Sequence, residues 1–78
     1  MLRDVEALLM TTTDVRSLVR SVIVTYGLPF AVMSVVDSLD GWKIAVHAGN
    51  GEILQFIVEA SECDEMRSKI RRTLEAER

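Results

Sequence analysis

The fold is decided by residues 30–58, where three apolar segments rich in β-branched residues alternate with short turns. The segments are Phe30-Ala-Val-Met-Ser-Val-Val36, Trp42-Lys-Ile-Ala-Val-His-Ala48 and Ile53-Leu-Gln-Phe-Ile-Val58. They are separated by Asp37-Ser-Leu-Asp-Gly41 and by Gly49-Asn-Gly51. Gly, Asn and Asp readily supply the positive φ angles that tight hairpins require. The stretch therefore predicts three antiparallel strands in a meander.

A helix is predicted on the N-terminal side of the meander, at about residues 13–26. Its apolar residues recur without interruption at helical spacing, namely Val15, Leu18, Val19, Val22, Ile23 and Tyr26. Thr11 and Asp14 resemble a capping box, and Thr13 is an alternative N-cap. Gly27 and Pro29 predict the end of the helix, because glycine favours the C′ position and proline cannot continue a helix.

A second helix is predicted to begin at Ser61-Glu-Cys-Asp-Glu65, with Ser61 as the N-cap. The acids complement the positive end of the helix dipole. Met66, Ile70 and Leu74 form a narrow apolar stripe. We expect Cys63 to lie on this stripe as a buried, unreactive thiol.

The expected fold class is α+β, with the order α-β-β-β-α and both helices packed on one face of the sheet. Residues 13–78 form this domain, and residues 1–12 form a lead-in. Within the lead-in, the spacing of Leu2, Val5, Leu8 and Leu9 is compatible with a short extra helix at residues 2–10.

Length and composition limit the possible functions. The chain has 78 residues, a net charge of −3 and one cysteine. A single cysteine excludes an internal disulfide and an all-cysteine metal site, and it is compatible with a reducing compartment. We expect a cytoplasmic protein without signal peptide, membrane span, metal or cofactor, since none of the corresponding motifs occurs. A core this small often depends on association, and we expect the partner to be a second copy, as a homodimer, or another protein. No small-molecule substrate is evident from the sequence.

Alternation along the strands gives the sheet two faces of different polarity. Trp42, Ile44 and Val46 belong to the more apolar face, which must lie under the helices. The first strand adds to the outer face either Val32 and Val36 or Met33 and Val35. Half-apolar outer faces often contact another protein. We therefore predict a non-enzymatic interaction module or adaptor whose contact surface comprises Val32, Lys43, His47, Ile53, Gln55 and Ile57.

Two alternative functions involve RNA, one as a binding partner and one as a substrate. The first is RNA binding through the basic cluster of the last helix, although such a cluster is more often a solvated helix face; it comprises Arg67, Lys69, Arg71 and Arg72. The second is a ribonuclease with His47 as general base. The sequence neighbours of His47 offer no second catalytic group, but the fold could bring Asp37 or Glu59 close to this side chain. The Gly49-Asn-Gly51 turn lacks the lysine and the helix of a phosphate-binding loop.

The element order resembles that of double-stranded-RNA-binding domains. That family carries a lysine cluster at the start of the last helix, where this chain has Ser61-Glu-Cys-Asp-Glu65, so no RNA-binding residue is carried over. Toxin ribonucleases of the HicA type look similar in order and carry a histidine on a strand, comparable to His47, but are typically basic. Small acidic secretion chaperones also share the order and dimerise around a partner peptide, without a motif that identifies this chain as one.

Overall fold

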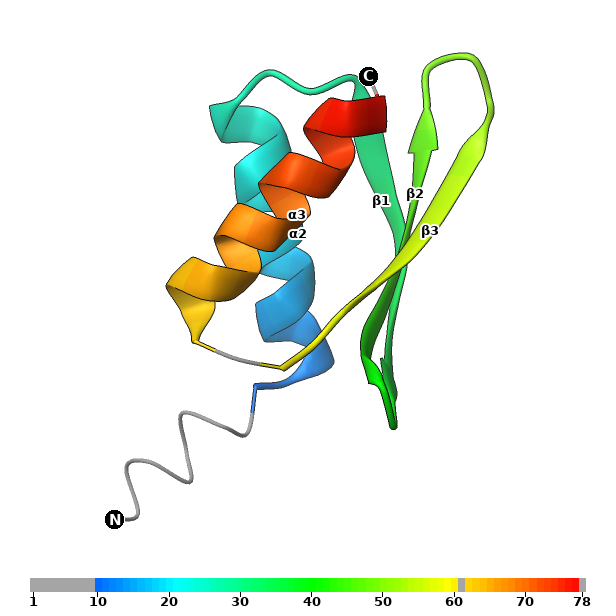
Figure 1. Ribbon diagram of the computed structural model, residues 1–78. Coiled ribbons are helices and arrows are strands. Elements are labelled where there is room, and N and C mark those ends of the chain that lie inside the picture. Colours follow the sequence, from blue (N-terminus) through cyan, green and yellow to red (C-terminus); the bar gives the residue numbers. More distant parts are fainter. Residues whose placement is uncertain (1–9, 61, 78) are drawn as a thin grey trace, which may run out of the picture.

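A computed structural model describes residues 10–60 and 62–77, and its element order is α-β-β-β-α (Figure 1). This confirms the predicted α+β fold. The elements are α2 (Thr12–Thr25), β1 (Phe30–Ser38), β2 (Gly41–Ala48), β3 (Ile53–Val58) and α3 (Cys63–Glu77). The extra helix predicted at residues 2–10 lies outside the described residues except for Met10.

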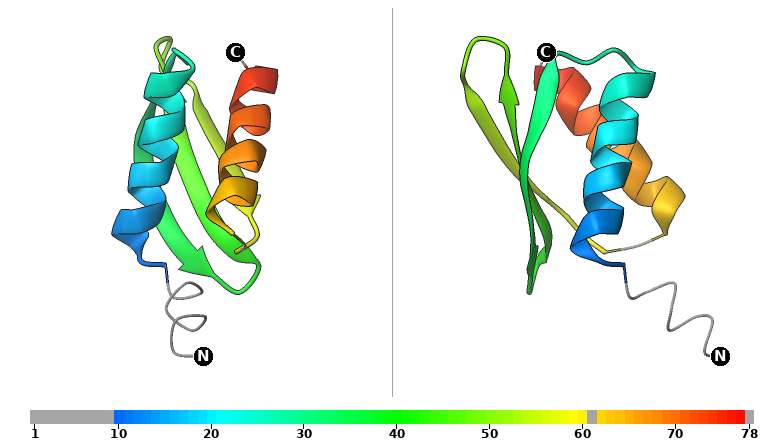
Figure 2. Two further views of the ribbon diagram at one scale, coloured as in Figure 1. Left: turned by 90° about the vertical axis from the view of Figure 1, so that its left-hand side faces the viewer. Right: turned by 180° about the vertical axis from the view of Figure 1, so that it is seen from behind.

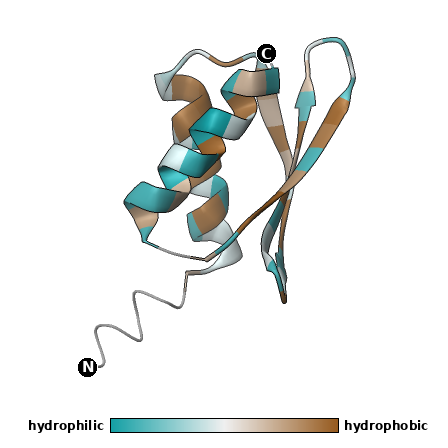
Figure 3. Cartoon of the chain, viewed as in Figure 1, coloured by the Kyte–Doolittle hydropathy of each residue, from teal (hydrophilic) through white to brown (hydrophobic). Residues whose placement is uncertain are grey.

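The molecule has two layers, because both helices cover the same face of the sheet (Figures 1 and 2). The strands lie in the order β1-β2-β3, with β2 in the centre. Helix α2 packs mainly against β1, and α3 packs beside α2 and against β3. Apolar bands run along α2 and β3, whereas the solvent side of α3 is hydrophilic (Figure 3). The core lies between the layers and includes Val15, Val19, Val22, Trp42, Ile44, Val46, Met66, Ile70 and Leu74.

Helix α2 begins and ends as its sequence predicts. The Thr11 hydroxyl accepts a hydrogen bond from the Asp14 amide at 3.1 Å, and the Asp14 carboxylate accepts one from the Thr11 amide at 3.0 Å. The N-cap is therefore Thr11 rather than Thr13. At the other end Gly27 has a φ of 60°, and the Leu28 amide donates to the Ile23 carbonyl at 3.0 Å. This is a Schellman motif, which satisfies the last carbonyls of the helix.

A bulge in β1 changes which of its side chains face the core. Val32 pairs with Val46, but the next pair is Ser34 with Ala45, so Met33 is an extra residue. Val32 and the buried Val35 consequently both pack on the core side. Neither predicted set for β1 is correct, because strict alternation does not survive an inserted residue. The placement of Val32 on the outer face is wrong.

The hairpin between β1 and β2 depends on Gly41. Gly41 has a φ of 130°, and a Cβ atom at this position would lie 2.5 Å from the Val58 carbonyl oxygen. The Ser38 hydroxyl donates to the Gly41 carbonyl at 2.8 Å. Gly41 thus allows the hairpin to close directly against the end of β3.

We expect Gly41→Ala to lower the free energy of unfolding by about 2–3 kcal/mol, since it adds both a strained φ and a clash with backbone. Gly49→Ala is the matched control, because Gly49 has open space around its Cβ position. Urea denaturation followed by circular dichroism measures both. Equal stabilities of the two variants would contradict this account of the hairpin.

Thr11→Ala should destabilise the protein by about 1 kcal/mol through loss of the cap. Thr13→Ala serves as the control, because Thr13 lies inside α2 and is exposed. Thermal denaturation of both variants distinguishes the two possible caps. A larger loss of stability in Thr13→Ala would identify Thr13 as the functional cap in solution.

Candidate functional site

The face of the sheet that the helices leave uncovered, here called the outer face, is built from three cross-strand rows. Register places the side chains of each row next to one another. The rows are Ala31, His47 and Ile53; then Ser34 with the bulged Met33, Ala45 and Gln55; then Val36, Lys43 and Ile57.

The outer face carries most of the exposed apolar surface. Among the residues that the structure describes, seven large hydrophobic side chains are exposed, and four of them belong to this face: Met33, Val36, Ile53 and Ile57. Ile53 is 58% exposed and Ile57 49%. These four side chains stand on the two edge strands, whereas the short Ala45 occupies the middle of β2. The face is therefore lower at its centre than along its apolar flanks.

The charge of the outer face differs from that of the whole protein. Lys43 is the one Lys or Arg among its strand residues, and none of them is Asp or Glu, although the chain carries a net charge of −3. Acidic side chains gather instead at the ends of the sheet. Asp37, Asp40 and Glu59 surround the hairpin between β1 and β2, while Glu52 and Glu77 line a pocket at the opposite end.

The structure brings together five of the six residues predicted for the contact surface. Lys43, His47, Ile53, Gln55 and Ile57 all lie on the outer face, and Val32 does not. Met33 was missed from the predicted site, although alternation offered it as one possibility. Its place depends on the bulge, for which the sequence of β1 contains no glycine or other marker.

Among residues 10–60 and 62–77, none on this face is a carboxylate or a second histidine that could act with His47 in catalysis. The one hydrogen-bond contact of its Nδ1 atom is with the carbonyl of the next residue, Ala48, at 3.4 Å. Asp37 pairs with Trp42, and Glu59 follows Val58, which also pairs with Trp42. Trp42 and His47 are five positions apart along β2, which corresponds to about 17 Å at strand spacing. The fold therefore does not bring either carboxylate to His47.

The basic cluster of α3 is divided between two sides of the helix. Arg67 donates to the Ser21 hydroxyl at 3.2 Å. The guanidinium of Arg71 lies 4.6 Å from the centre of the Tyr26 ring and 3.5 Å from the Glu75 carboxylate. Both arginines thus contact or approach α2.

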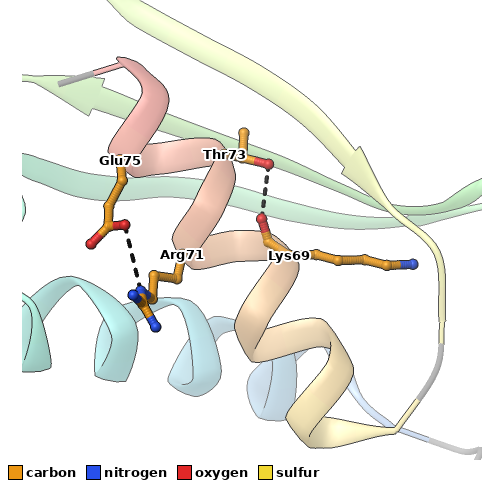
Figure 4. Close-up of polar contacts among 4 residues, drawn as sticks. All are labelled: Lys69, Arg71, Thr73 and Glu75. Atoms are coloured by element: carbon orange, nitrogen blue, oxygen red, sulfur yellow. Dashed lines mark hydrogen bonds and ion pairs between the residues drawn. The ribbon is translucent and has the colours of Figure 1, made fainter.

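Lys69 leaves α3 on the other side, away from Arg71 and toward the end of β3 (Figure 4). Its backbone carbonyl accepts a hydrogen bond from the Thr73 hydroxyl at 2.9 Å. Lys69 and Arg72 both line a groove with Ile57 and Val58. The four cations therefore do not form one phosphate-binding surface, and RNA binding through them stays a prediction that this geometry does not favour.

Cys63 is exposed rather than buried on the stripe of Met66 and Ile70, so this expectation is wrong. Cys63 is the first residue of α3, and the buried residues of this helix begin one turn later, at Met66. The predicted N-cap, Ser61, lies outside the described residues. Residues 10–60 and 62–77 contain no group of three or more His, Cys, Asp or Glu side chains that could hold a metal ion.

The chain matches no protein-family model, and no curated protein or solved structure is significantly similar to it. In the part of the chain that the structure describes, no helix is long and apolar enough to cross a membrane.

Proposed function

We propose that the protein is a non-enzymatic interaction module that acts as a homodimer through its outer face. The observation that carries this proposal is the grouping of Met33, Val36, Ile53 and Ile57 on one uncovered side of a three-stranded sheet. Exposed apolar groups of this kind are typical of protein–protein contacts. The absence of carboxylates from the strand positions of this face removes a charge that would oppose its burial.

A second copy would supply a surface of the right chemistry. A twofold contact joins the same patch from both molecules, so apolar flanks of one sheet can meet apolar flanks of the other. Sheets that pack face to face lie about 10 Å apart with interleaved side chains. Complete burial of a fully exposed isoleucine contributes about 1.5–3 kcal/mol, and Ile53 and Ile57, which are about half exposed, would each contribute about half of that. For a domain with so small a core, such a contact is a substantial gain in stability.

We also propose that the protein is cytoplasmic. A single cysteine that is exposed, as Cys63 is, fits a reducing compartment where thiols stay unpaired. The alternative enzymatic reading, a ribonuclease built on His47, gains no support from the surroundings of that side chain. If His47 were the general base of a ribonuclease, a His47→Ala variant would lose RNA cleavage, so undiminished cleavage by that variant excludes this reading.

Ile53→Glu combined with Ile57→Glu should convert a dimer near twice 8.7 kDa into a monomer. Burying two carboxylates in an apolar contact should weaken self-association by about a hundredfold or more. Light scattering over a low micromolar concentration range measures the molar mass. Circular dichroism verifies that the fold is intact.

The matched control is Val24→Glu combined with Leu39→Glu. It introduces the same charge at two exposed apolar residues that lie off the outer face, on α2 and at the tip of the first hairpin. This control should remain dimeric. A wild-type monomer, or a dimer unaffected by the glutamates at positions 53 and 57, would show that the outer face does not join two copies.

A further inference from the structure

The two edges of the sheet differ in how they are protected against further strand pairing. Edge strands in soluble proteins usually carry a charge, a proline or a bulge that prevents this pairing. β1 has the bulge at Met33 and carries the acid Asp37 next to its last residue, Ser38. β3 has the sequence Ile-Leu-Gln-Phe-Ile-Val, with neither charge, proline nor glycine, and it pairs with β2 in unbroken register. β3 is thus a strand edge without the usual protection.

Hydrogen bonding fixes which backbone groups of β3 face outward. The Ala48 amide donates to the Glu52 carbonyl at 2.8 Å, just before β3 begins. Bonding alternates along an antiparallel strand. Even-numbered residues of β3 therefore bond to β2. The N–H and C=O groups of Ile53, Gln55 and Ile57 point to the open edge, on which no further strand lies among the described residues.

Helix α3 lies along this edge and makes it one wall of a groove. The groove has a volume of about 360 Å³ and is lined by Ile57, Val58, Lys69, Arg72 and Thr73. Two of these five side chains are cations, and no carboxylate is among them. In an acidic chain this is a local positive site. It lies beside backbone groups that can accept a strand.

We propose that the groove between β3 and α3 binds an extended acidic peptide of a partner protein as a fourth strand of the sheet. Main-chain hydrogen bonds to Ile53, Gln55 and Ile57 hold the peptide, as in other cases of strand addition. Its alternate side chains point to opposite faces. Carboxylates on one side reach Lys69 and Arg72, and apolar side chains on the other extend the outer face next to Ile53 and Ile57.

This site goes beyond the proposed homodimer, because it uses the edge of the sheet rather than its face. A second copy is a poor occupant of the same edge. Twofold pairing of β3 with β3 would separate the two strands by about 4.8 Å and bring together two α3 helices that lie over them, whereas packed helices need 8–10 Å. The same pairing would also bring the cations Lys69 and Arg72 of one copy close to those of the other, and like charges repel. An acidic peptide meets neither obstacle.

The test uses fluorescence anisotropy with a labelled peptide of alternating glutamate and valine, about eight residues long, against the full chain. A lysine–valine peptide is the charge control. We expect binding of the acidic peptide only, weakening as salt is raised. Gln55→Pro removes the outward amide without touching the ladder to β2, and it should weaken binding about tenfold or more relative to Gln55→Ala.

Lys69→Glu combined with Arg72→Glu should abolish binding even if the proline variant fails to fold. Arg16→Glu combined with Arg20→Glu is its control, because it changes the net charge equally on α2. Equal binding by these two double variants, or by both peptides, would overturn the proposal. So would self-association that Gln55→Pro abolishes in a protein that binds no peptide, since the occupant would then be a second copy.

Met33→Glu combined with Val36→Glu separates this proposal from the homodimer. These residues lie on the outer face of β1, on the far side of the sheet from the β3 edge. The variant should lose self-association and keep peptide binding. If a folded variant lost both self-association and peptide binding, the groove would depend on the dimer, contrary to the proposal.

Discussion

Strand β2 is bonded to a strand on each side, and its inward side chains hold the two layers together. Ile44 and Val46 have no exposed surface, and Trp42 is nearly buried at the end of the same row. They are covered by helix residues from both ends of the chain, such as Val19 and Ile70. Burial of this one face fixes the position of α2 and α3. It also leaves the opposite face without any cover from the described residues.

The distribution of polarity follows from that one-sided arrangement. Two helices suffice to cover one side of three strands, and no other element of the described residues covers the opposite side. Five acidic side chains lie around the two ends of the sheet, and others lie on the helices. The outer face and the groove beside β3 stay free of carboxylates. An acidic protein thus keeps two surfaces on which a neutral or acidic partner is not repelled.

Much of the fold could be predicted because periodicity and turn chemistry are local. Val15 to Val22 repeat at helical spacing, Thr11 and Asp14 cap the helix, and Gly27 ends it, all within one segment of chain. The bulge at Met33 could not be predicted, since it depends on how β1 fits β2 and no glycine marks it. One inserted residue moved Val32 to the core. The exposure of Cys63 was missed for a related reason: a stripe of apolar residues does not reveal at which residue the helix reaches the sheet.

The candidate site shows the same division. The residues from β2 and β3 were assigned to the correct face because these two strands pair without interruption. The separation of Arg67 and Arg71 from Lys69 and Arg72 also follows from helical geometry, but their different neighbours, α2 on one side and β3 on the other, are tertiary facts. The four cations are close together in the sequence, which suggests one basic surface, but they lie on two different sides of α3.

The unequal edges of the sheet also decide how far any assembly can extend. A strand can add at β3, but the bulge and the acid of β1 offer no second edge on which the next molecule could continue. Head-to-tail polymerisation requires two compatible ends, so it stops after a single addition. In the proposed assembly, the bulge at Met33 makes β1 a poor edge for a further strand, so the apolar edge of β3 alone does not provide the repeated pairing that fibres require.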